Sequence, residues 1–394
     1  MITGVISSVL GGLVLLIAAG WLLIEWQYRK RQGNNLVFGA GEWNLEVYEP
    51  QHYVIVGEPE LINRTTASEV MVPELTVETT LLSGDTLQGI TVKAEITPRH
   101  PDAEARSDSY WFAYIVKLRK TTRLQIRIDI EGPDLRALKA LWVRVPYVTY
   151  GPQGRVPKQG HVVVPLKFPN PDEQLGWRQT PVAQVLPVPT HLLTHLDDPV
   201  SVVKRYVVSN AQPGDIITLG ETPVAIMQGR WRHPQDVRPG WVARRLCYYF
   251  MPTSSLATAC GMQTLVDIVG PWRVLYAFVA GAIAKKFLGK PGMFYQLAGE
   301  QARLIDDVTG TLPPYDQFIV LGPANPEEVV QQIRQATGLE AAIVDVNDLK
   351  AVKILAATPA VDSQLLIQAL RDNPAGNADE QTPLVLVRPT TVSS

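Results

Sequence analysis

The spacing of apolar residues divides this chain of 394 residues into three kinds of segment. The first is an uncharged apolar run from Ile2 to Ile24, followed by the basic triplet Arg29-Lys30-Arg31. About 23 helical residues at ~1.5 Å each reach ~34 Å, enough to cross a hydrocarbon core of ~30 Å. The run therefore predicts a single-pass transmembrane helix, with residues 1–31 as a membrane anchor.

The charges around this run predict its orientation. Trp21 and Trp26 suit the membrane interface, and a basic triplet stays on the cytoplasmic side. A cleaved signal peptide is the alternative, but its positive charge would normally precede the apolar run. We expect an uncleaved anchor, with the soluble domains on the cytoplasmic side of the membrane.

The second kind of segment alternates apolar and polar residues. After a Gly- and Asn-rich linker at 32–44, seven such runs lie within residues 45–168. They are His52–Gly57, Leu75–Thr80, Gly89–Ile96, Tyr110–Leu118, Arg123–Ile130, Leu141–Thr149 and His161–Phe168. In the fifth run every second residue is Leu or Ile, as expected for a strand with one buried face. The pattern predicts an antiparallel β-sandwich-like domain. It contains no catalytic constellation, so we interpret it as structural.

The third kind of segment mixes helical and strand patterns. A proline-rich linker at 169–189 precedes it, the predicted α/β domain covers 190–389, and a tail follows at 390–394. The expected elements are a helix at 200–208, strands at 216–219 and 224–227, and a final strand at 384–387. The whole chain is thus predicted to be an α+β multidomain protein.

One part of this domain predicts a strand–helix–strand unit. Gln317–Leu321 and Ala341–Val346 are short apolar runs. Between them, Asn325 is placed to cap the first turn of a helix, and Gly338 to end it. Because the connection contains a helix, we expect the two strands to pair in parallel.

Acidic residues gather around this unit. Asp345, Asn347 and Asp348 lie at the carboxyl end of the second strand, and Asp306 and Asp307 precede the first. Ligands bind at the carboxyl ends of such strands, and carboxylate oxygens suit Mg²⁺ or Mn²⁺. Asp306, Asp307 and Asp345 are therefore candidate metal ligands. The alternative is that these residues only solvate loops or cap helices.

Two other local features have a competing interpretation. His191 and His195 are one turn apart in a predicted short helix, 190–198, but the Glu of a zinc-binding HExxH motif is absent. We interpret them as two histidines on a surface turn. Leu275–Ala284 is apolar but too short to span a bilayer, so it is either a core helix or a helix resting on the membrane surface.

Composition excludes several classes of protein. A net charge of −2 gives no basis for nucleic-acid binding. Two cysteines, Cys247 and Cys260, make neither a disulfide framework nor a four-ligand zinc site. No Walker spacing of glycines is present, so a phosphate loop of that type is excluded.

Four stretches of the C-terminal half carry a family resemblance. They are PGDIITLGETPVAIMQGR (213–230), IDDVTGTLPPYDQFIVLGP (305–323), TGLEAAIVDVNDL (337–349) and TPLVLVRP (382–389). Together and in this order they resemble the coenzyme F-420 γ-glutamyl ligases, in particular membrane-anchored, extended relatives of unassigned substrate. The resemblance covers about half of the chain.

The resemblance implies an activity and a site. Members of that family join glutamate to a deazaflavin precursor, using GTP and a divalent metal through an acyl-phosphate, and they form dimers. It implies Asp306 or Asp307 and Asp345 as metal ligands. It also implies that Gln228, Arg230 and Asn347 lie near the nucleotide.

The chain departs from the family pattern at phosphate-facing positions. Ile226 stands where the family has a lysine, and Gln228 where it has a glutamate. The segment after Asp348 is also shorter and has fewer glycines and arginines. Two functions follow: a GTP- and metal-dependent amide ligase, or a non-catalytic scaffold that assembles a membrane protein complex.

Overall fold

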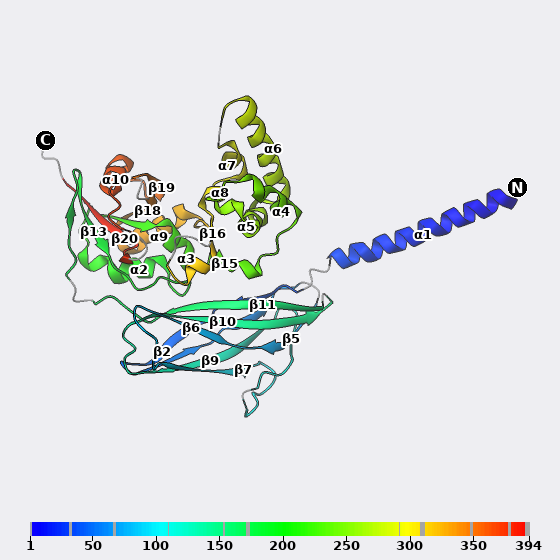
Figure 1. Ribbon diagram of the computed structural model, residues 1–394, viewed down its shortest axis with the longest axis horizontal. Helices are drawn as coiled ribbons and strands as arrows, with labels where there is room; N and C mark the ends of the chain where they lie inside the picture. Colours follow the sequence, from blue (N-terminus) through cyan, green and yellow to red (C-terminus); the bar gives the residue numbers. More distant parts are fainter. Residues whose placement is uncertain are drawn as a thin grey trace. The chain divides into compact units, whose positions relative to one another are not determined.

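The computed structural model describes residues 2–30, 34–65, 68–108, 110–152, 154–170, 174–290, 292–307, 312–346, 350–376 and 380–390 (Figure 1). The chain separates into two compact units. The first contains residues 1–79, 89–135 and 143–161, and the second contains residues 80–88, 136–142 and 162–394. It is a mixed α/β protein with an antiparallel, β-rich N-terminal region.

The N-terminal helix α1 runs from Ile2 to Lys30. Its part with described side chains, Gly11–Gln27, is a shorter apolar helix. Among the described residues no single helix combines the length and apolarity needed to cross a membrane. Helices α5 (Ala259–Val269) and α6 (Pro271–Phe287) meet the requirement only as a pair, and they are bent by 111°.

The β-rich region consists of two antiparallel sheets. The strands are β1 (Leu36–Gly39), β2 (Trp43–Glu49), β3 (His52–Gly57), β4 (Glu60–Asn63), β5 (Val70–Leu75), β6 (Glu78–Ser83), β7 (Thr91–Arg99), β8 (Tyr114–Val116), β9 (Thr121–Glu131), β10 (Leu138–Gly151) and β11 (Gly154–Pro165). The first sheet has the order β1-β4-β9-β3-β2, with β7 also pairing β9. The second has the order β11-β10-β5-β8, with β6 also pairing β10. The predicted antiparallel architecture is confirmed.

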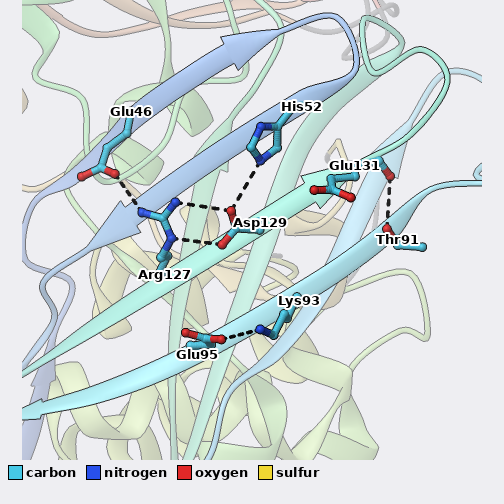
Figure 2. Close-up of polar contacts among 8 residues, drawn as sticks. All are labelled: Glu46, His52, Thr91, Lys93, Glu95, Arg127, Asp129 and Glu131. Carbon is cyan, nitrogen blue, oxygen red and sulfur yellow. Dashed lines mark hydrogen bonds and ion pairs between the residues drawn. The ribbon is translucent and has the colours of Figure 1, made fainter. Parts of the chain in front are cut away.

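Strand β9 shows why the alternation was readable. Its even-numbered residues from Leu124 to Ile130 are fully buried, while its polar residues lie on the outer face. On that face Arg127 binds Glu46 at 3.0 Å and Asp129 at 3.1 Å, and His52 approaches Asp129 at 3.4 Å (Figure 2). Arg127 thus has acidic partners on its own strand and on β2, two strands away.

The second unit contains a six-stranded sheet between helices. Its strands are β12 (Arg178–Gln179), β13 (Ala183–Val188), β14 (Ile216–Gly220), β18 (Glu340–Val346), β19 (Val352–Ala357) and β20 (Leu384–Pro389), in the order β12-β13-β20-β14-β18-β19. Helices α2 (Pro199–Tyr206), α3 (Glu221–Met227) and α9 (Pro326–Thr337) share one core with this sheet. Helix α10 (Ser363–Leu370) shares another core with side chains from the same strands.

A group of helices and a small sheet complete this unit. The helices are α4 (Trp241–Leu246), α5, α6, α7 (Met293–Ala298) and α8 (Gln301–Leu304), which lie together in Figure 1. The small sheet contains β15 (Trp231–Arg232), β17 (Ile319–Val320) and β16 (Asp306–Asp307), in that order. Apolar side chains of these helices and of Ile305, Ile319 and Leu321 form one cluster.

Two strand predictions in this unit are wrong. Residues Val224–Met227 are not a strand but the end of α3, and all four are buried. A short run that is apolar throughout has no period that separates strand from helix. The predicted parallel pair is also wrong, because β17 pairs with β15 and β16 while β18 pairs in parallel with β14. The prediction paired two strands that are close in the sequence, whereas in the sheet β18 pairs with a strand that is distant in the sequence.

The predicted ends of the helices are met only in part. Gly338 ends α9 with a left-handed φ of 77°, as predicted. Asn325 makes no side-chain cap, and its amide instead contacts Glu328 at 3.3 Å. Residues 190–198 are not a helix. Asp197 accepts hydrogen bonds from the backbone N–H and the hydroxyl of Thr194, and such local bonds compete with helix formation.

Candidate functional site

Two parallel strands bring acidic residues to the same edge of the sheet. Strands β14 and β18 run in register from Ile216 opposite Glu340 to Gly220 opposite Val344. The next residues along the two strands are Glu221 and Asp345. Ligand sites of α/β sheets form at such carboxyl ends. The parallel pairing therefore places two carboxylates at the carboxyl ends of neighbouring strands.

A third carboxylate reaches the same place from the small sheet. Asp306 begins β16 and pairs with Val320 of β17. Asp307 is the second residue of this strand, and its side chain lies outside the described part. Asn347 also lies outside the described residues, so its predicted role in nucleotide binding stays a prediction.

These three residues line a cavity of about 450 Å³. Its walls come from strands β14, β18 and β20, from α3, from Asp306 of β16, from the end of α10 and from the loops between these elements. The described lining residues are Thr190, His191, Leu192, Leu193, Thr218, Gly220, Glu221, Thr222, Pro223, Ile226, Asp306, Leu312, Tyr315, Val344, Asp345, Val346, Leu370, Asn373, Pro374, Ala375, Gly376, Gln381, Thr382, Pro383 and Val385. None of them is a lysine or an arginine. The cavity therefore presents carboxylates without a cationic side chain in its described walls.

Burial and, after it, mutual repulsion raise the pKa values of two of these carboxyl groups. Burial, then the charges of Asp345 and Asp306, raise the pKa of Glu221 to about 8, although Lys353 acts in the opposite direction. Burial and the charge of Asp345 raise the pKa of Asp306 to about 6. Shifts of this size with a stated cause mark candidate functional sites. At neutral pH Glu221 holds a proton on its carboxyl group.

The donor set fits a hard divalent cation. Three carboxylates supply only oxygen atoms, which Mg²⁺ and Mn²⁺ prefer over nitrogen or sulfur. Within the described chain their oxygens do not all lie within 4.8 Å of one another. A cation that binds here must therefore draw the carboxylates together and displace the proton of Glu221.

Gln228 and Arg230 do not line this cavity. The Gln228 amide donates to the carbonyl of Ala324 at 2.9 Å, and its oxygen accepts from the backbone N–H of Ala324 at 2.7 Å. Arg230 donates to the carbonyl of Gly322 at 2.5 Å and to Gln301 at 3.0 Å. Both side chains hold the loop before α9, and their predicted nucleotide contacts stay a prediction.

Ile226, at the position of the family lysine, lies in the cavity wall. Its side chain is buried and packs in a cluster with Tyr315, Phe318 and Val320. The resemblance aligns this position with a lysine, whereas the Ile226 side chain makes only a hydrophobic contact here. Any cation that faces a bound phosphate here has to come from elsewhere.

The histidines are inside the protein rather than on a surface turn. The His191 ring lies within hydrogen-bond distance of the Tyr206 hydroxyl at 2.6 Å and of the Asp197 carboxylate at 2.9 Å, and it lines the cavity. His195 is largely enclosed beside Trp231, and burial lowers its pKa to about 4. The interpretation of His191 and His195 as neighbours on a surface turn was therefore wrong, because each ring is enclosed by different residues.

Glu221 and Tyr315 are the site residues that sequence reasoning missed. Glu221 carries the same signal as Asp345, an acid at the carboxyl end of a short apolar strand, here Ile216–Leu219. Tyr315 is fully buried, and its hydroxyl makes no hydrogen bond with the described residues. Burial raises its pKa well above the usual value. No sequence pattern placed this phenol in the cavity wall.

Comparison with known proteins adds a relationship for the first half of the chain. Residues 37–168 match the family described as the N-terminal Ig-like domain of F420-0:gamma-glutamyl ligase. No curated protein matches the chain. The family match covers the β-rich region and does not include the residues of the cavity.

Several solved structures share local features with the chain. The GAE domain of GGA2p from Saccharomyces cerevisiae is 10% identical in sequence and has a TM-score of 0.21. The match covers 34% of this chain and 93% of the GAE domain chain. The yeast GGA1 GAE domain has 15% identity, a TM-score of 0.19, and coverages of 34% and 95%. The E. coli chaperone DraB has 15% identity, a TM-score of 0.17, and coverages of 40% and 71%. At these TM-scores the likenesses carry no argument about function. The family match alone relates the chain, at a coarse level, to the γ-glutamyl ligases.

Proposed function

We propose that the cavity binds a divalent cation together with the phosphates of a nucleotide, and that the protein is an amide-forming ligase. The observation that supports this proposal most directly is the convergence of Glu221, Asp306 and Asp345 without a cationic side chain in the described walls. The relationship of the β-rich region to the γ-glutamyl ligases supports the same reaction class. GTP is the nucleotide that this relationship favours.

The charge of the cavity explains why a cation is needed. Phosphates carry negative charge, and three carboxylates would repel them. A bound Mg²⁺ or Mn²⁺ would supply the positive charge that holds the phosphates and offsets charge developing on the transferred phosphoryl group. Glu221, Asp306 and Asp345 would hold this ion, since all three side chains line the same cavity.

The size of the cavity and its remaining wall residues suit a small-molecule site. The volume of about 450 Å³ lies in the range of small-molecule sites, roughly 300–1,000 Å³. Leu192, Leu312 and Val344 provide apolar wall. The Tyr315 hydroxyl can donate a hydrogen bond to a substrate oxygen, because it is buried and unsatisfied among the described residues.

We also propose that α1 tethers this ligase to a membrane on the cytoplasmic side. The support is the uncharged run from Ile2 to Ile24 and the basic triplet that follows it. A homodimer remains part of the proposal, as in the resembled family. No evidence for nucleic-acid binding arises from the composition.

A second candidate function is a scaffold that has lost the reaction. The observation in its favour is the buried Ile226 at a position where the family has lysine, together with the engagement of Gln228 and Arg230 by backbone carbonyls. In this case the cavity would bind neither nucleotide nor metal. The protein would instead recognise a membrane protein complex.

Calorimetry of the full chain in detergent separates the two functions. Mn²⁺ is titrated first, and the Mn²⁺–GTP complex second. The test variant is Asp345→Asn, and Glu327→Gln is the control because Glu327 is an exposed acid on α9. We expect binding by the wild type and the control, and an affinity at least about tenfold lower, or ~1.4 kcal/mol, in Asp345→Asn.

Two outcomes would favour the scaffold. One is no heat with wild-type protein at any concentration of Mn²⁺ or Mn²⁺–GTP. The other is binding that Asp345→Asn leaves unchanged, since the ion would then lie outside the cavity. Thermal denaturation of each variant without metal checks that a loss of binding is not a loss of fold.

A further inference from the structure

Helix α6 is apolar on two opposite faces, but the protein covers only one of them. Val274, Ala277 and Ala284 are buried against the other helices. The exposed large side chains follow at helical intervals of three or four residues along the opposite face. They are Trp272 (80% exposed), Tyr276 (64%), Val279 (49%), Ile283 (52%) and Phe287 (73%). A helix that is hydrophobic all round belongs in an environment that is apolar on both sides.

The segment around the end of α4 (Trp241–Leu246) adds further exposed side chains to this group of helices. Tyr248 is 86% exposed, and Trp241, Tyr249 and Met251 are also exposed. The Tyr249 ring lies 5.2 Å from the ring of Phe278 on α6, so the segment after α4 adjoins this helix. We call the exposed stripe of α6 together with these four residues the aromatic face. Exposed apolar side chains in this number on one group of helices mark an interaction surface.

The segment that carries the aromatic face has mostly positive charges. Within residues 241–290 the sequence has one acidic residue, Asp267, whose charge is paired with Arg232 at 2.6 Å. Six basic residues lie in the same segment: Arg244, Arg245, Arg273, Lys285, Lys286 and Lys290. This local excess contrasts with the net charge of −2 for the whole chain. The partner of this face should therefore be apolar and anionic.

The cations are placed to reach an aqueous boundary. The Arg245 guanidinium lies 4.6 Å from the centre of the Trp241 ring, and the Lys286 ammonium lies 5.7 Å from that of Phe287. Long basic side chains beside exposed tryptophan and tyrosine rings are typical of the membrane–water interface. Lysine, by contrast, is depleted at interfaces between proteins.

The geometry favours a helix lying along a membrane rather than crossing it. As an α-helix of 17 residues, α6 is ~26 Å long, shorter than a ~30 Å hydrocarbon core. Helix α5 cannot extend it, because the chain turns by 111° between them. The buried residues of α5 belong to the protein core, including Met262 and Leu265.

We propose that the aromatic face docks onto the surface of an anionic lipid bilayer, with α6 lying in the headgroup region. The aromatic and aliphatic side chains enter the acyl boundary, while Lys285, Lys286 and Lys290 contact anionic headgroups. This contact is independent of metal or nucleotide binding in the cavity. It gives the α/β unit its own membrane attachment, whatever role α1 has.

Site-directed spin labelling of the full chain in vesicles tests the docking. A nitroxide is attached at Tyr276→Cys in a Cys247→Ser, Cys260→Ser background, with Glu327→Cys as the control position on α9. The vesicles contain phosphatidylcholine with or without phosphatidylglycerol. We expect the label at 276 to collide with oxygen more than with a water-soluble nickel complex, and the label at 327 to show the reverse.

A second measurement is made on protein that retains Cys247 and Cys260, so that it does not depend on the cysteine substitutions. Lipids brominated along the acyl chain should quench tryptophan fluorescence more strongly in the wild type than in Trp272→Phe, and the difference isolates Trp272. Lys285→Glu with Lys286→Glu should remove the effect of phosphatidylglycerol on both signals. This pair of substitutions lies outside the cavity.

Three results would overturn the proposal. A label at 276 that remains accessible to the nickel complex in both vesicles would show an aqueous face. Spin–spin broadening at 276 would instead assign the face to a second copy of the chain. Equal quenching of the wild type and Trp272→Phe would place this ring away from lipid.

Discussion

Charged side chains are arranged differently on the outer face of the first sheet and in the cavity of the α/β unit. On the sheet, Arg127 lies between Glu46 and Asp129, so opposite charges alternate across strands β2 and β9 (Figure 2). In the cavity, Glu221, Asp306 and Asp345 approach one another without a lysine or arginine among the described wall residues. The first arrangement pairs opposite charges, and the second gathers like charges.

Under the proposed function, this difference separates charges that solvate the fold from charges that bind a ligand. Exposed ion pairs contribute little to stability, because water and ions screen them. Clustered carboxylates destabilise the folded state unless a cation binds, so their presence calls for a functional explanation. Substitutions that make one region resemble the other test the comparison.

The largest effect should come from creating an unpaired carboxylate where none exists. Asp215 is almost fully buried, and Arg388 binds both of its oxygens, at 2.9 and 2.8 Å. Arg388→Met leaves this carboxylate buried without its partner. We expect a loss of about 3 kcal/mol in the free energy of unfolding, measured by urea denaturation.

The double variant Arg388→Met, Asp215→Asn is the control for this effect. Removing the buried charge should recover part of the lost stability. A double variant as unstable as Arg388→Met alone would assign the loss to the stacking of Arg388 on Trp177, at 4.2 Å, rather than to the charge.

A smaller effect of opposite sign is expected in the cavity. The pKa of Glu221 is raised to about 8 in the folded protein, from an ordinary value of 4.5. Its contribution to stability is therefore fully present below pH 4.5 and is lost as the pH rises through 8. In the presence of EDTA, Glu221→Gln should leave stability unchanged near pH 4.5 and raise it by about 1–2 kcal/mol near pH 9. This figure is below that of the whole shift because the cavity is open to water.

Metal provides the second arm of this experiment. Mn²⁺ should stabilise the wild type more at high pH than at low pH, since it competes with the proton of Glu221. Glu221→Gln should weaken this stabilisation. Parallel pH profiles for the two proteins without metal would mean that Glu221 titrates normally and that the carboxylates do not interact.

The smallest effect is expected on the outer face of the first sheet. Arg127→Met removes the partner of Glu46 and one partner of Asp129, but all three side chains are in contact with water. The urea midpoint should stay within experimental error of the wild type. A large loss would show that this ion-pair ladder is structural, and the contrast with the cavity would fail.

Sequence reasoning succeeded where a physical period was present. The alternation of β9 gave a strand, because residues 124–130 bury every second side chain in one core. The acids Asp306 and Asp345 were found because they flank apolar runs. Glu221 obeys the same rule but was missed, since Val224–Met227 was interpreted as a strand and not as the helix that begins at the acid.

Pairing between distant segments was not predictable from these local patterns. The parallel partner of β18 is β14, more than 100 residues earlier in the sequence, and not β17. The sequence also did not show which of the two apolar faces of α6 is buried. Its sequence showed a hydrophobic segment, but only packing decided that Val274 and Ala277 face protein while Trp272 and Tyr276 face outward.

The sequence by itself determined the antiparallel β-rich region, the apolar N-terminal helix and two of the three carboxylates of the cavity. These features depend on the spacing of apolar and acidic residues that are close in the sequence, and this spacing can be read from the sequence itself. The tertiary structure decided which strands pair, which acids face one another and which side of a helix is left uncovered. Such choices depend on the burial of side chains from distant segments, so they exist only once the core has formed.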